Sequence, residues 1–313
     1  MRRRAFGTFL AAAVVAAVVG TSAQQPAAPA AGAPQGEGRR GGGPGGGGAP
    51  AAPPAIKQVK PGLYMVTGLG GNSTVRVTNE GIILVDTKNL GQANYDALMQ
   101  QIRTVSQAPV RYVFITHHHQ DHSGNIGPAQ AAGAEVIVHE GLNKALETYK
   151  AAQGTPERSK VSYATTRTVK VGNASAEARF FGPAHTSGDT WVYFPDVRVI
   201  ATGDSFVATA PNADYPFGGS VVEWVKALDQ VLKLDFDTAI PGHGNDPLTK
   251  ADVQKFRDNL NTIVTRGREL VKKGTPKDQL MANLKTDDLG WTLNAQQWNQ
   301  PARLDPFYAE LSK

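Results

Sequence analysis

The stretch "FITHHHQDHSGN", Phe114–Asn125, holds four of the seven histidines of this 313-residue chain. It overlaps the apolar run "VRYVFIT" (110–116), which predicts a buried β-strand that ends where the histidines begin. Side chains of an extended segment alternate with a period of two. We therefore expect His117 and His119 to point to one side and to share one target, while His118 points the other way.

Asp121 and His122 leave the same loop in a different direction and can serve a second ion close to the first. Three more candidate ligands each follow an apolar strand at a glycine-containing turn: His185 in "GPAHTSGD", Asp204 in "IATGDSF" and His243 in "IPGHGND". Residues at the ends of rigid strands are well placed to form a precise site. The sequence therefore predicts one polar site built from several strand ends.

The rest of the chain alternates strands and helices. Short β-branched runs with turn residues between them predict antiparallel strands at "LYMVTG", "STVRVT" and "GIILVDT", and helical patterns lie at 91–105, 126–132 and 141–152. A second strand-rich block contains "TVKV", "AEARFFG", "DTWVYFP" and "RVIATGD", and capping-box patterns open two further helices at Ser220–Glu223 and Thr249–Asp252. Two similar halves indicate two sheets packed face to face with helices outside.

The first residues have the layout of a secretory signal peptide, since Arg2–Arg4 precede an uncharged run over Ala5–Val19 and small residues follow. A membrane-anchoring helix is the alternative, but the run is short and alanine-rich for one. We expect residues 1–23 to be removed. The mature protein is then expected to be periplasmic or secreted, without stable membrane insertion.

Residues 24–55 predict a disordered linker, because Ala, Pro and Gly supply 26 of these 32 residues. The folded domain is expected over 56–313. Loss of the three signal arginines would lower the formal charge from +5 to +2, which argues against a general affinity for nucleic acid. The absence of cysteine excludes disulfides and thiolate metal ligands. The oligomeric state stays open.

The chain resembles the metallo-β-lactamase superfamily over about residues 82–244, through the motif His-x-His-x-Asp-His and later residues in the family's order. The resemblance implies an α/β fold, a four-layer αβ/βα sandwich of two mixed β-sheets with outer helices and metals at one edge. It implies two divalent metal ions, the first bound by His117, His119 and His185, the second by Asp121, His122 and His243, with Asp204 bridging both.

The resemblance also implies a metal-dependent hydrolase that uses a metal-bound hydroxide on a small-molecule substrate, with Asp121 as the catalytic residue that orients the nucleophile or takes its proton. Imidazole and carboxylate ligands favour zinc, while iron and manganese stay open. A bridging aspartate at position 204 resembles the thioesterase, lactonase and phosphodiesterase branches of the family, and a lactone, ester or thioester is the expected substrate. A β-lactamase is the alternative, followed by a mononuclear iron persulfide dioxygenase and a non-catalytic metal-binding module.

Other residues have less specific signals. Asp86 of "LVDT" matches an early family aspartate and is expected to brace the site rather than to bind metal. His118 is expected to be structural or to line the pocket, His139 to be structural, and Asp189 either to support the site or to be incidental. The segment 209–220 is a candidate specificity loop.

Two further segments have open roles. The segment 68–73, "GLGGNS", is either a mobile flap or an ordinary connection. The C-terminal segment with Trp291, Trp298 and Phe307 either covers the pocket or packs on the outside.

Overall fold

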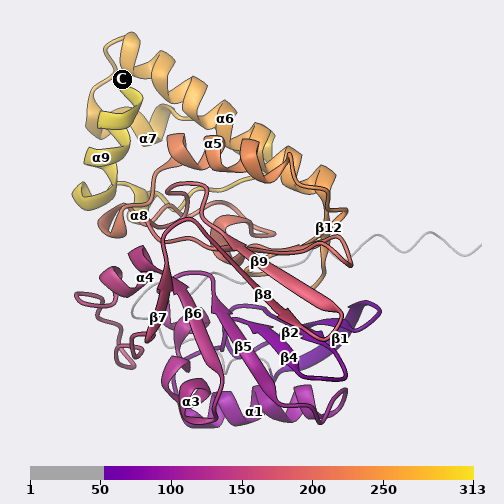
Figure 1. Ribbon diagram of the computed structural model, residues 1–313. Helices are drawn as coiled ribbons and strands as arrows, with labels where there is room; N and C mark the ends of the chain where they lie inside the picture. The colour runs from indigo at the N-terminus through magenta and orange to yellow at the C-terminus, as the bar shows by residue number, and fades with distance from the viewer. Residues whose placement is uncertain (1–52) are drawn as a thin grey trace, which may run out of the picture. The chain divides into compact units, whose positions relative to one another are not determined.

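Two β-sheets, one of seven strands and one of six, form the framework of the computed structural model, which describes residues 53–313 (Figure 1). The seven strands of the first sheet lie in chain order: β1 (Ala55–Lys60), β2 (Leu63–Thr67), β3 (Ser73–Val77), β4 (Ile82–Val85), β5 (Val110–Ile115), β6 (Glu135–His139) and β7 (Val161–Tyr163). β1 to β4 pair antiparallel, and β4 to β7 pair parallel. Parallel neighbours need crossover connections, which contain α1 (Gln92–Arg103), α2 (Gln120–Ser123), α3 (Ile126–Ala131) and α4 (Glu140–Ala145).

The second sheet has the order β13-β12-β11-β10-β9-β8. Its strands are β8 (Thr166–Val171), β9 (Ala174–Arg179), β10 (Trp191–Phe194), β11 (Val199–Ala201), β12 (Thr238–Ile240) and β13 (Leu248–Thr249). β11 and β12 pair parallel, and the other neighbours pair antiparallel. Between β11 and β12 the chain forms the 3-10 turns η1 (Gly203–Ser205) and η2 (Tyr215–Phe217) and the helix α5 (Val221–Val231).

A helical C-terminal region follows β13. It comprises the long helix α6 (Lys250–Lys272) and then η3 (Lys277–Gln279), α7 (Leu280–Asn283), η4 (Asp287–Leu289), α8 (Ala295–Trp298) and α9 (Pro301–Leu311). Trp291, Trp298 and Phe307 are buried in the core that α5 and α6 share with the second sheet. The C-terminal segment therefore packs outside the second sheet.

Successive side chains of a strand point to opposite faces of its sheet. Each sheet therefore packs on both faces, and three apolar layers separate the four structural layers of helices, sheet, sheet and helices. On β10, Val192 and Phe194 pack between the two sheets, while Trp191 and Tyr193 pack on the other face with α5 and α6. A third apolar cluster joins α1, α3 and α4 to the outer face of the first sheet (Figure 1). This is the predicted four-layer sandwich of two mixed sheets.

Local signals predicted helix starts better than helix ends. Thr249 and Asp252 form a reciprocal capping box at the start of α6, and the Ser220 hydroxyl accepts from the backbone N–H of Glu223 at the start of α5. The helix predicted over 141–152 is wrong in length, since α4 ends at Ala145.

Backbone hydrogen bonds show how α4 ends. The N–H groups of Glu147 and Thr148 donate to the carbonyls of Lys144 and Ala145, three residues back, so the helix tightens into a final turn and does not continue. The strands β1, β7 and β13 were not predicted from the sequence.

The predicted signal peptide and nearly all of the predicted linker lie outside the described residues. Within residues 53–313, no helix has both the length and the apolar character needed to cross a bilayer.

Candidate metal centre

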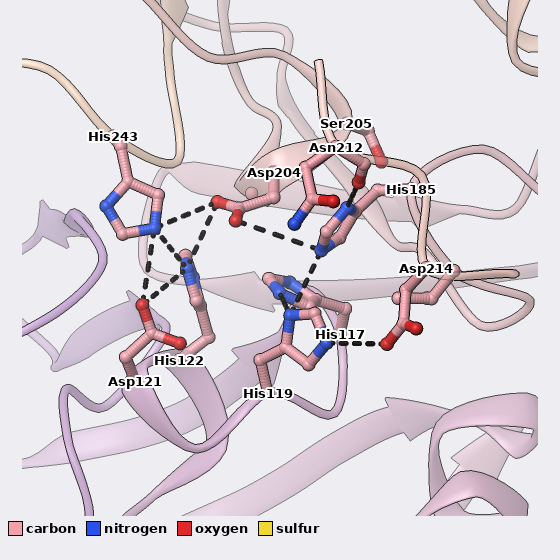
Figure 2. A network of polar contacts seen from close by, with 12 residues as sticks. His117, His119, Asp121, His122, His185, Asp204, Ser205, Asn212, Asp214 and His243 are labelled. Atoms are coloured by element: carbon pink, nitrogen blue, oxygen red, sulfur yellow. Dashed lines mark hydrogen bonds and ion pairs between the residues drawn. The ribbon is translucent and has the colours of Figure 1, made fainter. Parts of the chain in front are cut away.

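Four loops bring the seven predicted ligands together at one edge of the sandwich (Figure 2). The loop after β5 supplies four of them from the first sheet, and the loops after β9, β11 and β12 supply one each from the second. They form two neighbouring clusters, in each of which the potential ligand atoms lie within 4.8 Å of one another: His117, His119, His185 and Asp204 in the first, and Asp121, His122 and His243 in the second.

In the first cluster three imidazole nitrogens converge. Nδ1 of His119 lies 3.1 Å from Nε2 of His117 and 3.1 Å from Nε2 of His185. Burial lowers the pKa of His117 well below its ordinary value and that of His185 to about 4, and neighbouring imidazoles add to both shifts. Neutral rings with converging lone pairs are the donor set that a divalent transition metal binds.

In the second cluster imidazoles face carboxylates. Nε2 of His243 lies 3.2 Å from Oδ2 of Asp121 and 3.3 Å from Nε2 of His122. Burial alone would lower the pKa of His243, but the carboxylates of Asp204 and Asp121 raise it to about 10. Burial would likewise raise the pKa of Asp121, but His122 and His243 bring it below its ordinary value. In this cluster, protons compete directly with a metal for the imidazoles.

Asp204 lies between the two clusters. Its Oδ1 lies 3.2 Å from Nε2 of His122 and 3.3 Å from Nε2 of His243, while its Oδ2 lies 3.8 Å from Nε2 of His185. Oδ1 is buried and has no hydrogen-bond partner among residues 53–313. A Cβ atom at Gly242 would lie 2.2 Å from Oδ1, so this close approach of the backbone requires glycine. A carboxylate with one oxygen directed at each cluster is suited to bridge two cations.

Groups behind the rings fix two of the histidines. Nδ1 of His117 lies 3.1 Å from the Thr116 hydroxyl, and Nδ1 of His122 lies 2.8 Å from Oδ2 of Asp86. The Asp86 carboxylate also accepts from the backbone N–H and the hydroxyl of Thr116, at 2.7 Å each. Such contacts set ring orientation and leave the opposite nitrogen free for a metal. They agree with the prediction that Asp86 braces the site.

Two orienting groups were not predicted from the sequence, and both lie in the segment 209–220. The Asp214 carboxylate accepts from Nε2 of His119 at 2.8 Å, and the main-chain carbonyl of Asn212 accepts from Nδ1 of His185. Burial would raise the pKa of Asp214, but the hydrogen bond from His119 and nearby histidines lower it. This segment therefore holds the rings of two predicted ligands, His119 and His185, in place.

His118 points away from the first cluster, as the strand period predicts. Its buried ring packs between Tyr149 and Phe217, with centroid distances of 4.8 and 4.5 Å. Its Nε2 lies 3.7 Å from Oδ2 of Asp214 and has no hydrogen-bond partner within the described part of the chain. These contacts agree with a structural or pocket-lining role.

His139 and Asp189 have structural contacts. The His139 ring accepts from the backbone N–H of Gly141 at the start of α4 and stacks on Phe180. The Asp189 carboxylate accepts from the backbone N–H and the hydroxyl of Thr186, at 2.8 and 2.7 Å, and so closes the turn that follows His185.

The segment 68–73 forms hydrogen bonds with two of the loops that carry predicted metal ligands. The N–H of Gly71 donates to the main-chain carbonyl of Asp121 at 3.0 Å, and the N–H of Asn72 donates to that of Gly242 at 2.8 Å. The amino group of Lys88 donates to the Gly71 carbonyl at 2.7 Å. These contacts argue against the flap interpretation and indicate a brace between the loops.

A family model for the metallo-beta-lactamase superfamily matches residues 66–243. The 2,4-dinitroanisole O-demethylase subunit alpha of Nocardioides sp. (strain JS1661) is 28% identical over 165 residues, 52% of this chain and 49% of that relative, so the match spans about half of that relative's length. Metallo-beta-lactamase IND-1 of Chryseobacterium indologenes is 27% identical over 193 residues, 58% of this chain and 75% of that relative.

Among solved structures, a metallo-beta-lactamase from Pontibacter korlensis is similar to this chain with a TM-score of 0.58 and 20% sequence identity. The match covers 66% of this chain and 99% of that one. At this identity the likeness supports the shared fold alone.

Proposed function

Because the chain belongs to the metallo-β-lactamase superfamily of metal-dependent hydrolases, we propose that it is an exported dinuclear enzyme that hydrolyses lactone, ester or thioester substrates. The observation that carries this proposal is the position of Asp204, whose two carboxylate oxygens face different clusters. A bridging carboxylate is useful to a site with two ions and has no comparable role in a site with one.

We assign the ligands by cluster. The first ion is bound by Nε2 of His117, Nδ1 of His119 and Nε2 of His185, and the second by Asp121, His122 and His243, with Asp204 shared. The residues fit such ions, since the imidazole nitrogens of the first cluster converge on one point and the buried Oδ1 of Asp204 makes no hydrogen bond within residues 53–313. Imidazole and carboxylate without thiolate favour zinc.

Two divalent ions would act as Lewis acids and lower the pKa of a bound water from 15.7 to roughly 7. The protein's own contribution is to position groups around that water. Asp121 is 29% exposed and His243 is 38% exposed, whereas His117 and His185 are buried, which places the open side of the site at the second cluster. Asp121 is therefore placed to orient the attacking water or to accept its proton.

The surroundings of the metal centre constrain the substrate. The ligands supply two carboxylates, and those of Asp86 and Asp214 lie directly behind His122 and His119, so the charge of two divalent ions would be balanced within the site and sets no requirement for an anionic substrate. Tyr149 lies beside His119, with ring centroids 6.0 Å apart, and Phe217 lies beside Tyr149, with ring centroids 5.6 Å apart. A hydrophobic group next to the scissile bond would pack there.

A β-lactamase is the second candidate, because IND-1 and other relatives carry that name. The aspartate at position 204 ranks it below the ester-type hydrolases. A persulfide dioxygenase with a single iron is the third candidate, and it would leave the second cluster without a role.

Metal analysis and a substrate panel test the proposal. We expect about two zinc ions per chain and chelator-sensitive hydrolysis of a thioester, a lactone or an aryl ester, with kcat/KM of about 10⁴ M⁻¹s⁻¹ or more for the preferred class. The panel should include a chromogenic cephalosporin and an aryl methyl ether, the latter because one relative is named an O-demethylase. A single iron with oxygen consumption would overturn the proposal, and preferred cleavage of the cephalosporin would replace it with the second candidate.

Export is tested separately. The mass of the protein recovered from the periplasm or medium should correspond to cleavage near Ala23, as the arrangement of Arg2–Arg4 and the following apolar run predicts. A full-length protein retained in the cytoplasm would contradict export and leave the hydrolase proposal unaffected.

A further inference from the structure

The segment Asn212–Asp214 lies behind two of the three histidines of the first cluster. The main-chain carbonyl of Asn212 accepts from Nδ1 of His185, and the Asp214 carboxylate accepts from Nε2 of His119 at 2.8 Å (Figure 2). The orientation of both rings therefore depends on where this short segment is held.

A single arginine from the C-terminal helix α9 binds this segment. Nη1 of Arg303 donates to Oδ1 of Asn212 at 3.0 Å and to the main-chain carbonyl of Ala213, and its Nη2 lies 3.8 Å from Oδ1 of Asp214. The side chains of Arg303 and Asp214 are only 13% and 8% exposed. The planar guanidinium is suited to bind several acceptors with fixed geometry, and it supplies the positive charge that a buried carboxylate needs.

The anchoring of α9 can be separated from this contact. Leu304, Phe307 and Leu311 are buried in the core beneath α9, and the Glu310 carboxylate accepts from the Ser220 hydroxyl at 2.5 Å at the start of α5. These contacts dock the helix independently of Arg303. Arg303 also lies beyond the residues 66–243 that match the family model, so the contact comes from a part of the chain outside that match.

We propose that Arg303 is a positioning residue for the first metal ion. It holds Asn212–Asp214 so that His119 directs Nδ1, and His185 directs Nε2, at the same point. The inference rests on the proposed function, because it takes these two histidines as ligands of one ion. Without the guanidinium, Oδ1 of Asn212 and the Ala213 carbonyl lose a donor, and the Asp214 carboxylate loses a neighbouring positive charge. The segment would then be held mainly by the backbone N–H of Asp214, which donates to the His185 carbonyl, and its position would be less fixed.

The test uses the variant Arg303→Met in the full chain. The matched control is Asp305→Asn on the same helix, whose carboxylate forms a surface ion pair with Lys277 at 2.6 Å. The first readout is the affinity of each site for zinc in competition with a chelator. We expect Arg303→Met to weaken the first site about tenfold, the lower end of the range for groups that orient metal ligands, and to leave the second site unchanged.

The second readout distinguishes positioning from general stability. In the cobalt-loaded protein, ring N–H protons of ligand histidines give separate, strongly shifted ¹H NMR signals that exchange with D₂O. We expect the signals of His119 and His185 to shift and exchange faster in Arg303→Met. Those of His117 and His122, whose partners are Thr116 and Asp86, should remain as in the native protein.

Each outcome has one meaning. A native protein that binds fewer than two ions would overturn the proposed function. A native protein with two ions and an Arg303→Met variant with unchanged affinities and N–H signals would overturn the role of Arg303 alone, as would an equal effect of Asp305→Asn. If Arg303→Met fails to fold, Arg303→Lys decides, since lysine keeps the charge without the planar fork. It is expected to show a smaller effect on the same two signals, and unchanged signals would overturn the role.

Discussion

Lys88 offers a direct test of the electrostatics around the metal centre, because its side chain is completely buried. Its Nζ donates to the main-chain carbonyls of Val66 and Gly71 at 2.6 and 2.7 Å. Burial lowers its pKa to about 7, although the negative charges of Asp86 and Asp121 act to raise it. A neutral amine has two N–H donors, which suffice for these two carbonyls. We therefore predict that Lys88 is neutral in the native protein at alkaline pH.

The size of the effect follows from the two pKa values. Between about pH 7.5 and 9.5 the unfolded chain, in which Lys88 has its ordinary pKa of 10.5, binds a proton that the native protein releases. Stability rises with pH wherever the unfolded state binds more protons, so the free energy of unfolding should increase across this window. A full proton is worth about 1.36 kcal/mol per pH unit, and partial protonation of the native state near pH 7.5 reduces the total to roughly 2.5 kcal/mol.

The assay is urea denaturation of the metal-free native protein and the metal-free Lys88→Met variant at both pH values. Subtracting the two free energies of unfolding cancels the contributions of other titrating groups. The native protein should gain about 2.5 kcal/mol relative to the variant at the higher pH. Lys226→Met, on the exposed side of α5, controls for the loss of one surface lysine. A difference between native and Lys88→Met that stays the same at both pH values would refute a neutral buried amine.

Three further predictions concern the ions. Gly71→Ala places a Cβ atom 2.1 Å from Cε1 of His122 and should weaken the second site at least tenfold with the first site retained, as measured by chelator competition. Calorimetry near pH 7.5 in buffers of different ionisation enthalpy should show that metal binding at the second site releases protons, because the pKa values of His122 and His243 are raised. Binding at the first site should release few protons, because the pKa of His185 is lowered to about 4. Equal proton release from both sites would contradict this prediction. His118→Phe should keep both ions by metal analysis, since this ring packs between Tyr149 and Phe217, and loss of an ion would contradict the structural role of His118.

The fold and the convergence of the seven predicted ligands could be predicted from the sequence, because strong local signals coincided. Each ligand follows an apolar strand, and the ends of strands that lie side by side meet at a common edge. The period of two along the strand also predicted that His118 would face away from His117 and His119. The residue types available then limited the chemistry to imidazole and carboxylate ligands.

The groups that orient the ligands could not be predicted in the same way. Asn212 acts through its main-chain carbonyl, which every residue possesses, so its type carries no signal. Asp214 lies in an irregular segment with no period to show where its side chain points. Arg303 is 91 residues away from Asn212 in the chain, and only the packing of α9 brings them together. The strand β1 was missed because its sequence, AIKQVK, has no regular alternation of polar and apolar residues and follows directly on the Ala, Pro and Gly-rich segment.

The two clusters differ in their affinity for protons, and this difference follows from where the carboxylates lie. Asp121 lies in the second cluster, and Oδ1 of Asp204 faces the same imidazoles. These two carboxylates keep His243 protonated at neutral pH in the metal-free chain, because they raise its pKa to about 10. A metal must therefore displace protons to enter the second cluster, whereas it meets neutral rings in the first. As the pH falls, protons compete with the metal for the imidazoles of the second cluster before they do so in the first. In the proposed dinuclear hydrolase, we therefore expect the ion beside Asp121 to be lost first and activity on the acid side to fall with that ion.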